Sequence, residues 1–195
     1  MRRIYLDYNA TTPVAPSVQD AMLPFLSEHY GNPSSNHLLG RAAAEAIEDA
    51  RGHVAALMNA DRDEILFTGC GTESNNLALW GIMTRDAPPF RGHLVVSRFE
   101  HPSVAEPAKY LERLGFEVSY VPCSPHGVVE PKTVRAALRP DTKLVSIMHA
   151  NNEIGTIQPL REITKLCHER QVHVHTDAAQ TAGKIPIDVE KLEVD

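Results

Sequence analysis

Three parts of this chain carry side chains or backbone groups that could do chemistry, and each adjoins an apolar run. Asp177 follows the run Val172–Thr176, His101 lies shortly after Leu94–Ser97, and the glycine-rich segment Gly69–Ser74 opens a helical stretch. A carboxylate can pair with a protonated ring nitrogen, and an imidazole can stack on a flat heterocycle. Backbone amides at a helix N-terminus bind phosphate. Together the three parts indicate a site for a phosphorylated heteroaromatic compound.

The segment Gly69–Ser74 fits an anion-binding turn. Its glycines allow backbone amides to turn towards an anion, and the N-terminus of the following helix adds partial positive charge. No lysine follows the glycines, so the segment is not a P-loop and ATP or GTP is disfavoured. The alternative is an ordinary structural turn in which Thr72 caps the helix.

Asp177 lies where a buried strand is predicted to end. A carboxylate at such a position must find a cationic partner or accept a proton. A pyridinium nitrogen is one such partner, and pairing with it makes the ring an electron sink for a carbanion at the substrate Cα. Gln180, three residues further on, can donate its amide to a phenolic oxygen. These residues indicate pyridoxal phosphate, while the alternative is that Asp177 only caps the segment that follows.

A metal site is the competing interpretation of the same strand. His173, His175 and Asp177 alternate along the chain and share one face of the strand, as ligands of Zn²⁺ can. A buried parallel strand can also place such histidines against a neighbouring helix, and no second pair of ligands with supporting spacing occurs in the sequence. We therefore expect no metal.

The elements that must position these residues alternate between strands and helices. Expected strands are 65–68, 94–97, 117–121, 144–148 and 172–176, and expected helices are 73–83, 103–113, 132–139 and 160–170. This order predicts an α/β fold with a mostly parallel sheet and helices on both faces. In such sheets ligands bind beyond the carboxyl ends of the strands, and 150–155 joins the segments named above at that edge.

The first sixty residues are predicted to be helical after an extended start. Pro16 suits the first turn of one helix, and Ser35 or Asn36 can cap a second that runs to Met58. Apolar residues recur at helical spacing along the second helix, so we expect one face to pack and the other to face water.

Composition excludes several classes of partner. The chain has 195 residues, 43% hydrophobic and 23% charged, which suffices for a sizeable core. The net charge of −6 and the scattered Lys and Arg argue against nucleic acid and anionic membranes. Three dispersed cysteines indicate neither a disulfide framework nor a CxxC metal site, which favours a reducing compartment. With Asp7 interrupting the N-terminal apolar residues, we expect no signal peptide and a cytoplasmic location.

Six segments, in order, resemble one known family. They are Tyr5–Pro13, Gly31–Ser35, Gly71–Leu77, Glu100–His101, His149–Gly155 and His175–Gln180. They resemble the cysteine desulfurases of the class V aminotransferase group, including relatives that act as selenocysteine lyases, and the resemblance runs from residue 4 to the last residue. It implies the large domain of a fold type I pyridoxal phosphate enzyme, active as a homodimer. Such an enzyme releases sulfur from L-cysteine as a persulfide on an enzyme cysteine, leaves L-alanine and passes the sulfur to an acceptor protein.

The resemblance also implies roles for individual residues at the cofactor. Gly71 and Thr72 hold the cofactor phosphate. His101 stacks on the ring and assists proton transfer, so it is the one catalytic residue implied. Asp177 pairs with the pyridine nitrogen.

Three further positions follow from the same motifs. Asn152 and Gln180 lie on the phenolic-oxygen side of the cofactor, and Asn32 is a candidate for binding the substrate carboxylate. In the family the cofactor-binding lysine, the persulfide cysteine and the substrate-binding arginine are expected beyond Asp195. Lys184 is not expected to replace that lysine, because the family places its lysine elsewhere.

The expected organisation is an N-terminal arm, residues 1–15, that packs on a small domain outside this chain, followed by residues 16–195 as the N-terminal part of the large domain. We expect this segment alone to be inactive and to expose apolar surface. The alternatives are a selenocysteine lyase with the same pocket, or a non-catalytic fragment of the pyridoxal phosphate fold.

Overall fold

The computed structural model describes residues 3–86 and 91–195, and its fold forms two compact units. The first comprises Met1–Ala56 and Asp61–Ile65, and the second comprises Leu57–Ala60 and Leu66–Asp195. The second unit holds the sheet and nearly all the predicted site residues.

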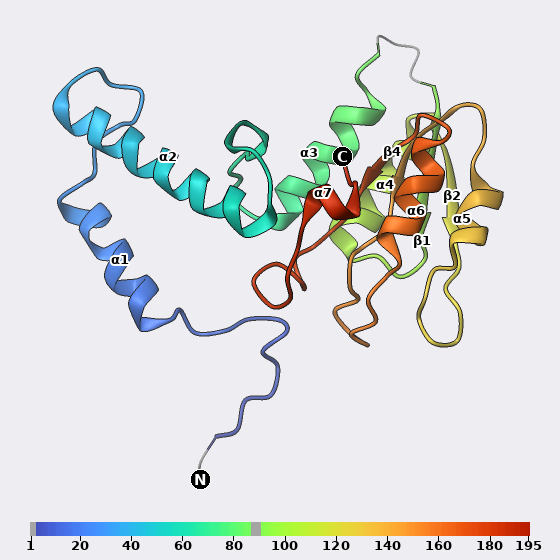
Figure 1. The fold of residues 1–195 in the computed structure, drawn as a ribbon, viewed down its shortest axis with the longest axis horizontal. Coiled ribbons are helices and arrows are strands. Elements are labelled where there is room, and N and C mark those ends of the chain that lie inside the picture. Colours follow the sequence, from blue (N-terminus) through green and yellow to red (C-terminus); the bar gives the residue numbers. More distant parts are fainter. Residues whose placement is uncertain (1–2, 87–90) are drawn as a thin grey trace. The chain divides into compact units, whose positions relative to one another are not determined.

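The sheet of the second unit has four parallel strands (Figure 1). They are β1 His93–Ser97, β2 Glu117–Val121, β3 Thr142–Ser146 and β4 His173–His175. Their order is β2-β1-β3-β4. From β1 the chain moves to β2 on one side and then crosses to β3 on the other side, so the strand order reverses between β1 and β3. Ligands of open α/β sheets bind at such a reversal, outside the carboxyl ends of the strands.

Helices cover both faces of this sheet, as predicted. They are α3 Gly71–Met83, α4 Pro102–Arg113, α5 Pro131–Ala137, α6 Leu160–His168 and α7 Val189–Leu192. On one face Leu94 and Leu144 pack with α3 and α4, and on the other Val95 and Val145 pack with α5 and α6. Because strand side chains alternate between faces, neighbouring residues of β1 and β3 enter separate cores. The predicted α/β fold is confirmed.

The predicted strand 65–68 is wrong. The chain there is irregular, and Leu66 and Phe67 are 68% and 46% exposed. A strand needs a neighbour that accepts its ladder hydrogen bonds, and none of the described strands pairs with this segment. The glycine-rich turn therefore follows a loop and leads into α3.

The first unit consists of two helices and a short 3₁₀ turn, η1 Arg62–Glu64. Helix α1 spans Pro16–Ser27, which confirms the predicted start at Pro16, and α2 spans Leu38–Met58. The loop between them approaches α2 closely: a Cβ on Gly31 would lie 2.1 Å from the Leu39 carbonyl oxygen, so only glycine fits.

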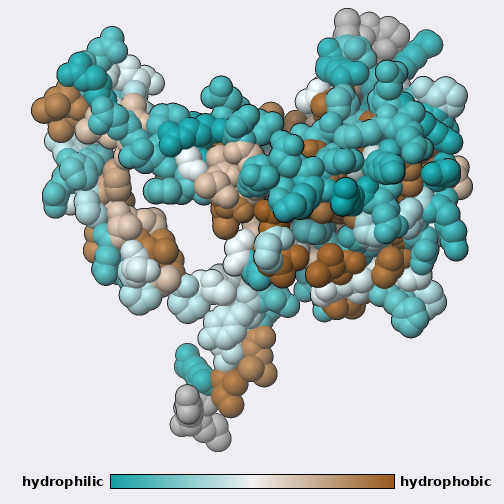
Figure 2. All heavy atoms as spheres, viewed as in Figure 1, coloured by the Kyte–Doolittle hydropathy of each residue, from teal (hydrophilic) through white to brown (hydrophobic). Residues whose placement is uncertain are grey.

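The predicted buried face of α2 is not formed in this structure. Only Gly40, Ala43 and Ala55 of the helix are buried, and α1 has no buried residue. Large apolar side chains of α1, such as Phe25 and Leu26, are exposed, and brown side chains lie at the surface along this segment in Figure 2. This is the predicted exposure of apolar surface.

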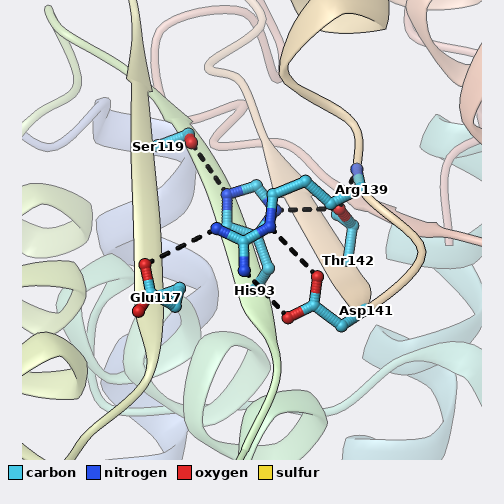
Figure 3. Close-up of polar contacts among 6 residues, drawn as sticks. All are labelled: His93, Glu117, Ser119, Arg139, Asp141 and Thr142. Carbon is cyan, nitrogen blue, oxygen red and sulfur yellow. Dashed lines mark hydrogen bonds and ion pairs between the residues drawn. The ribbon is translucent and has the colours of Figure 1, made fainter.

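At the amino edge of the sheet, buried His93 joins three strands (Figure 3). Its Nδ1 lies 2.8 Å from Thr142 Oγ1 on β3, and its Nε2 lies 2.8 Å from Ser119 Oγ on β2. Burial lowers the pKa of His93, so the neutral ring is favoured. Nearby, Arg139 forms ion pairs with Asp141 and Glu117.

Candidate active site at the carboxyl edge of the sheet

Asp177 continues the sheet two residues beyond β4. Its carbonyl oxygen accepts a hydrogen bond from His149 N at 2.9 Å. In its side chain, Oδ1 accepts from Ala179 N at 2.9 Å and Oδ2 accepts from Asn75 Nδ2 at 2.8 Å. The carboxylate is half-buried, and no described residue forms an ion pair with it. A partly desolvated carboxylate of this kind favours a cationic partner.

A chain of hydrogen bonds connects Asp177 to His101. Asn75 Nδ2 also donates to Ser103 Oγ at 2.8 Å, and Ser103 Oγ lies 2.7 Å from His101 Nδ1. Asn75 is buried on the core-facing side of α3, and Ser103 is buried in the first turn of α4. The carboxylate and the imidazole that were predicted separately from sequence thus belong to one network.

This network defines the tautomer of a neutral His101. Its Nδ1 accepts from the Ser103 backbone N at 3.1 Å, as the N-cap of α4. The Ser103 hydroxyl accepts from Asn75, so its own proton is available to Nδ1. We therefore assign the ring proton to Nε2. The side chain of His101 is exposed, so Nε2 is the atom at which it can donate or hold a proton towards a ligand.

The N-terminus of α3 has the open geometry that the predicted anion site requires. The first intrahelical bond runs from Ser74 N to Cys70 O at 3.1 Å, and the N–H groups of Gly71 and Thr72 precede it. A Cβ placed on Gly71 would meet no heavy atom within 4 Å, so space beside this turn is open. Cys70 is the N-cap, which corrects the alternative that Thr72 caps the helix.

A groove begins at this turn and runs between α3 and α4. It has a volume of about 560 Å³, and its lining includes Thr72, Asn76 and His101. The turn at Thr72 and the imidazole therefore line the same open space.

The two adjacent amides after β3 have different surroundings. Asn151 is buried and holds the loop together: its Oδ1 accepts from Glu153 N at 2.9 Å and Ile154 N at 3.0 Å. Asn152 is half-buried and lines a second groove of about 370 Å³, together with Phe99. The sequence had left open whether these amides tie the backbone or serve a ligand, and the structure assigns the first use to Asn151.

Gln180 lies in the turn after Asp177, where its Oε1 accepts from Lys184 Nζ at 2.7 Å. Lys184 is exposed and belongs to the same turn. The side chain of Gln180 is half-buried, and its predicted contact with the cofactor stays a prediction.

The metal interpretation finds no support among the described residues, where no group of His, Cys, Asp and Glu could hold an ion. The Nδ1 of His175 lies 2.9 Å from Ser146 Oγ, and burial lowers the pKa of His175 to about 4. His173 Nδ1 instead lies 3.6 Å from Asp195 Oδ1. The alternating residues thus have separate partners.

Asn32 belongs to the first unit, where its Oδ1 accepts from Ser34 N at 2.9 Å. Its role towards a substrate carboxylate stays a prediction. The sequence motifs predict no role for Asn75, although a signal is present: Asn75 recurs with the buried Leu79 and Met83 at intervals of about one helical turn. A polar residue on the core face of a helix indicates a specific buried partner.

The donor set fits pyridoxal phosphate. An open helix N-terminus suits its phosphate, and a half-buried carboxylate without a described cation suits its pyridinium nitrogen. With the parallel sheet, these features are typical of one class of protein, the α/β proteins that bind pyridoxal phosphate.

Comparison with known proteins gives the particular family. The model "Aminotransferase class-V" matches residues 4–195, and the chain belongs to this family, whose members depend on pyridoxal phosphate. Among curated relatives, "Cysteine desulfurase IscS" of Dictyoglomus turgidum is 50% identical over 194 residues, covering 100% of this chain and 49% of that protein. "Cysteine desulfurase" of Homo sapiens is 46% identical over 196 residues, covering 100% of this chain and 43% of that protein.

Solved structures agree with this family. One described as "SspA in complex with cysteine" has a TM-score of 0.95 and 40% identity, over 98% of this chain and 55% of the other. A "NIFS-like protein" also has a TM-score of 0.95, with 43% identity over 100% of this chain and 53% of the other. The chain spans about half the length of the curated relatives named above. Among the described residues, no helix is long and apolar enough to cross a membrane.

Proposed function

We propose that the complete protein is a pyridoxal phosphate-dependent cysteine desulfurase, which converts L-cysteine to L-alanine and passes the sulfur on as an enzyme persulfide. Relatives that bear this name match the whole of this chain at 46 to 50% identity. The observation that carries the proposal is the hydrogen-bond network from Asp177 through Asn75 and Ser103 to His101. It joins the residue expected at the ring nitrogen to the one expected at the ring face.

The residues of this chain bind and orient the cofactor. The N–H groups of Gly71 and Thr72 hold the phosphate by hydrogen bonds, aided by the partial positive charge of the α3 N-terminus. The Asp177 carboxylate would accept a hydrogen bond from the protonated ring nitrogen, and Asn75 donates to Oδ2 and so fixes the direction of that carboxylate. When bound, pyridoxal phosphate supplies an electron sink for bond changes at the substrate Cα.

His101 is the proposed proton carrier of this half of the site. Its Nδ1 is engaged by Ser103, so Nε2 faces the ligand and holds the proton that is exchanged. The exposed imidazole would stack on the cofactor ring and hold that nitrogen near the substrate. Asn152 and Gln180 donate to the phenolic-oxygen side, and Asn32 binds the substrate carboxylate.

The proposed biological setting follows the relatives' names. The sulfur serves iron–sulfur cluster or thio-cofactor synthesis, and a sulfur-acceptor protein receives it. We further propose that the protein acts as a homodimer in the cytoplasm. The 195-residue chain by itself is proposed to be inactive.

The test uses the complete protein supplied with pyridoxal phosphate and L-cysteine, with alanine and sulfide measured together. Equal amounts of alanine and reducible sulfur support the proposal, and loss of both in Asp177→Ala ties them to this site. The exposed Glu162 on α6 provides a control, Glu162→Gln, that should leave turnover unchanged. Faster turnover of L-selenocysteine than of L-cysteine would instead identify a selenocysteine lyase, and no turnover of either would favour a non-catalytic member of the fold.

A further inference from the structure

Glu100 is a buried carboxyl at the point where the strand order reverses, and the proposed reaction does not use it. It lies three residues after the end of β1 and immediately before His101, and its side chain is only 9% exposed. Its Oε1 accepts hydrogen bonds from Ser97 Oγ at 2.5 Å and from the Met148 backbone N at 2.9 Å. The side chain of Glu100, in the loop that follows β1, thus contacts the segment that follows β3.

The bond to Met148 takes the place of a missing backbone bond. Successive amides of a strand point to opposite neighbours. Beyond β3, the amides of Ile147 and His149 donate to His175 O and Asp177 O on the β4 side. The amide of Met148, between them, therefore points towards β1, whose last residue paired with β3 is Val96. The backbone has already turned away to α4 there, and Glu100 Oε1 accepts the amide instead.

A second bond ties the same two segments. Asn151 Nδ2 donates to the carbonyl oxygen of Phe99 at 3.2 Å. The turn that carries His101 is thus attached at neighbouring points to the segment that carries Asn152. Met148 donates to Glu100, and the next residue, His149, donates to Asp177 on the opposite side. The segment therefore also fixes the position of Asp177 along the strand direction relative to the turn that carries His101.

The second oxygen of Glu100 indicates its charge state. Oε2 is buried and has no hydrogen-bond partner among the described residues. Burial raises the pKa of Glu100 to about 7, opposed by the bonds from Ser97 and Met148 and assisted by the negative charge of Asp177. Asp177 is the charged group that acts on it from the β4 side, and the Ser97 hydroxyl and the Met148 amide contact it from the β1 and β3 sides. A neutral acid can occupy this position without an unpaired buried charge.

We propose that Glu100 is a positioning residue for His101: its carboxyl replaces a β1 carbonyl in the ladder and thereby holds the His101 turn in line with the Asn152 and Asp177 segments. The catalytic consequence rests on the function proposed above. The positioning itself depends only on the contacts just described.

The test compares Glu100→Gln, Glu100→Asp and Glu100→Ala in the complete protein, with Glu162→Gln as control. Glutamine keeps an oxygen that can accept from Met148, whereas aspartate is one methylene too short to reach it. The first readout is amide hydrogen exchange of Met148, measured without cofactor relative to Ile147 in the same segment. We expect Met148 to exchange about tenfold faster in the Asp and Ala variants and to change by less than about threefold in the Gln and control variants.

The second readout is the position of His101, observed as the ring ¹⁵N shifts of its imidazole and as the Kd for pyridoxal phosphate. We expect altered ring shifts and a Kd raised about tenfold in Glu100→Asp, with both restored in Glu100→Gln. Unchanged Met148 exchange in Glu100→Asp, or equal acceleration at Met148 and Ile147, would overturn the proposal. If Glu100→Ala does not fold, the Asp and Gln variants still decide it. Failure of the wild-type protein to bind pyridoxal phosphate would overturn the proposed function and leave the exchange result valid.

Discussion

The two edges of the sheet each hold a buried ionisable side chain that reaches a neighbouring strand, and they differ in how completely it is satisfied. At the amino edge, both ring nitrogens of His93 have hydroxyl partners, one on each side of β1 (Figure 3). At the carboxyl edge, Glu100 satisfies one oxygen and leaves the other buried without a described partner. The half-buried Asp177 likewise has no described cation.

This difference separates a stabilising edge from a binding edge. A fully satisfied polar group contributes to folding, whereas an unsatisfied one lowers stability and is retained where it serves a ligand or a proton. Substitutions at the amino edge should therefore change stability and leave cofactor binding alone. At the carboxyl edge, substitution of Asp177 should change cofactor binding, and substitution of Glu100 should change how stability depends on pH.

The largest effect is expected for His93→Ala. The change removes a fully buried ring and leaves the hydroxyls of Ser119 and Thr142 without this hydrogen-bond partner. The free energy of unfolding should therefore fall by about 3 to 4 kcal/mol. Denaturant unfolding of the complete protein without cofactor measures this. The folded fraction of the variant should bind pyridoxal phosphate with wild-type affinity. A large loss of affinity would show that the amino edge also contributes to cofactor binding.

Asp177→Asn is expected to weaken pyridoxal phosphate binding about 100-fold, or roughly 2.7 kcal/mol, because a neutral amide cannot pair with a pyridinium. Stability without cofactor should change little, since the amide oxygen can still accept from Ala179 N. Cofactor titration and thermal unfolding of the same sample check the two halves of this expectation. A variant that binds normally would remove Asp177 from the site.

Glu100→Gln is expected to flatten the pH dependence of stability. The folded pKa is raised from 4.5 to about 7, so stability is fully present below 4.5 and is lost as pH rises through about 7, by at most roughly 3 kcal/mol. The amide does not titrate, although its N–H groups lack a described partner. At about pH 8 the variant should be more stable than wild type by roughly 1 to 2 kcal/mol, with no gain near pH 4. Denaturant curves across this range measure the difference, and an identical slope in both proteins would show that Glu100 is ionised in the fold.

The smallest effect is expected for Arg139→Ala at the amino edge. Its ion pairs with Asp141 and Glu117 are exposed to solvent and screened by salt, so the Tm should fall only slightly. Scans at low and high salt should bring the two proteins together as salt rises. A large fall that salt does not reduce would mean that Arg139 supports His93 by packing.

Apolar runs in the sequence predicted the strands that are buried on both faces. They did not predict features that depend on a partner element elsewhere in the structure. All five residues of β1 are buried, and its run was recognised. The apolar run at 65–68 has the same character, but no described strand lies beside it. A single sequence cannot show whether a ladder partner exists, because pairing is set by tertiary structure. The apolar periodicity of α2 failed for the same reason.

The site could be predicted wherever position along a strand was sufficient. His101 and Asp177 were found because each follows a predicted strand at the carboxyl edge. Asn75 was not assigned, since its partners Ser103 and Asp177 lie 28 and 102 residues away. Glu100 belongs to a motif that the sequence shows, but its bond to Met148 spans 48 residues and follows only from the order of the strands.

The attachment of Glu100 to Met148 has a consequence for how the chain tolerates changes in length. The connection from Ser97 to Pro102 must return a side chain to one amide of the neighbouring segment, so one extra residue there would displace Glu100 from its partner. The turn 124–127 in the connection after β2 is held in a different way, because two of its backbone carbonyls accept from side chains: His126 O from Thr156 Oγ1 at 3.2 Å and Gly127 O from Gln158 Nε2 at 2.9 Å. An insertion after β1 should therefore displace the His101 turn, whereas an insertion after β2 should disturb the loop that carries Asn152.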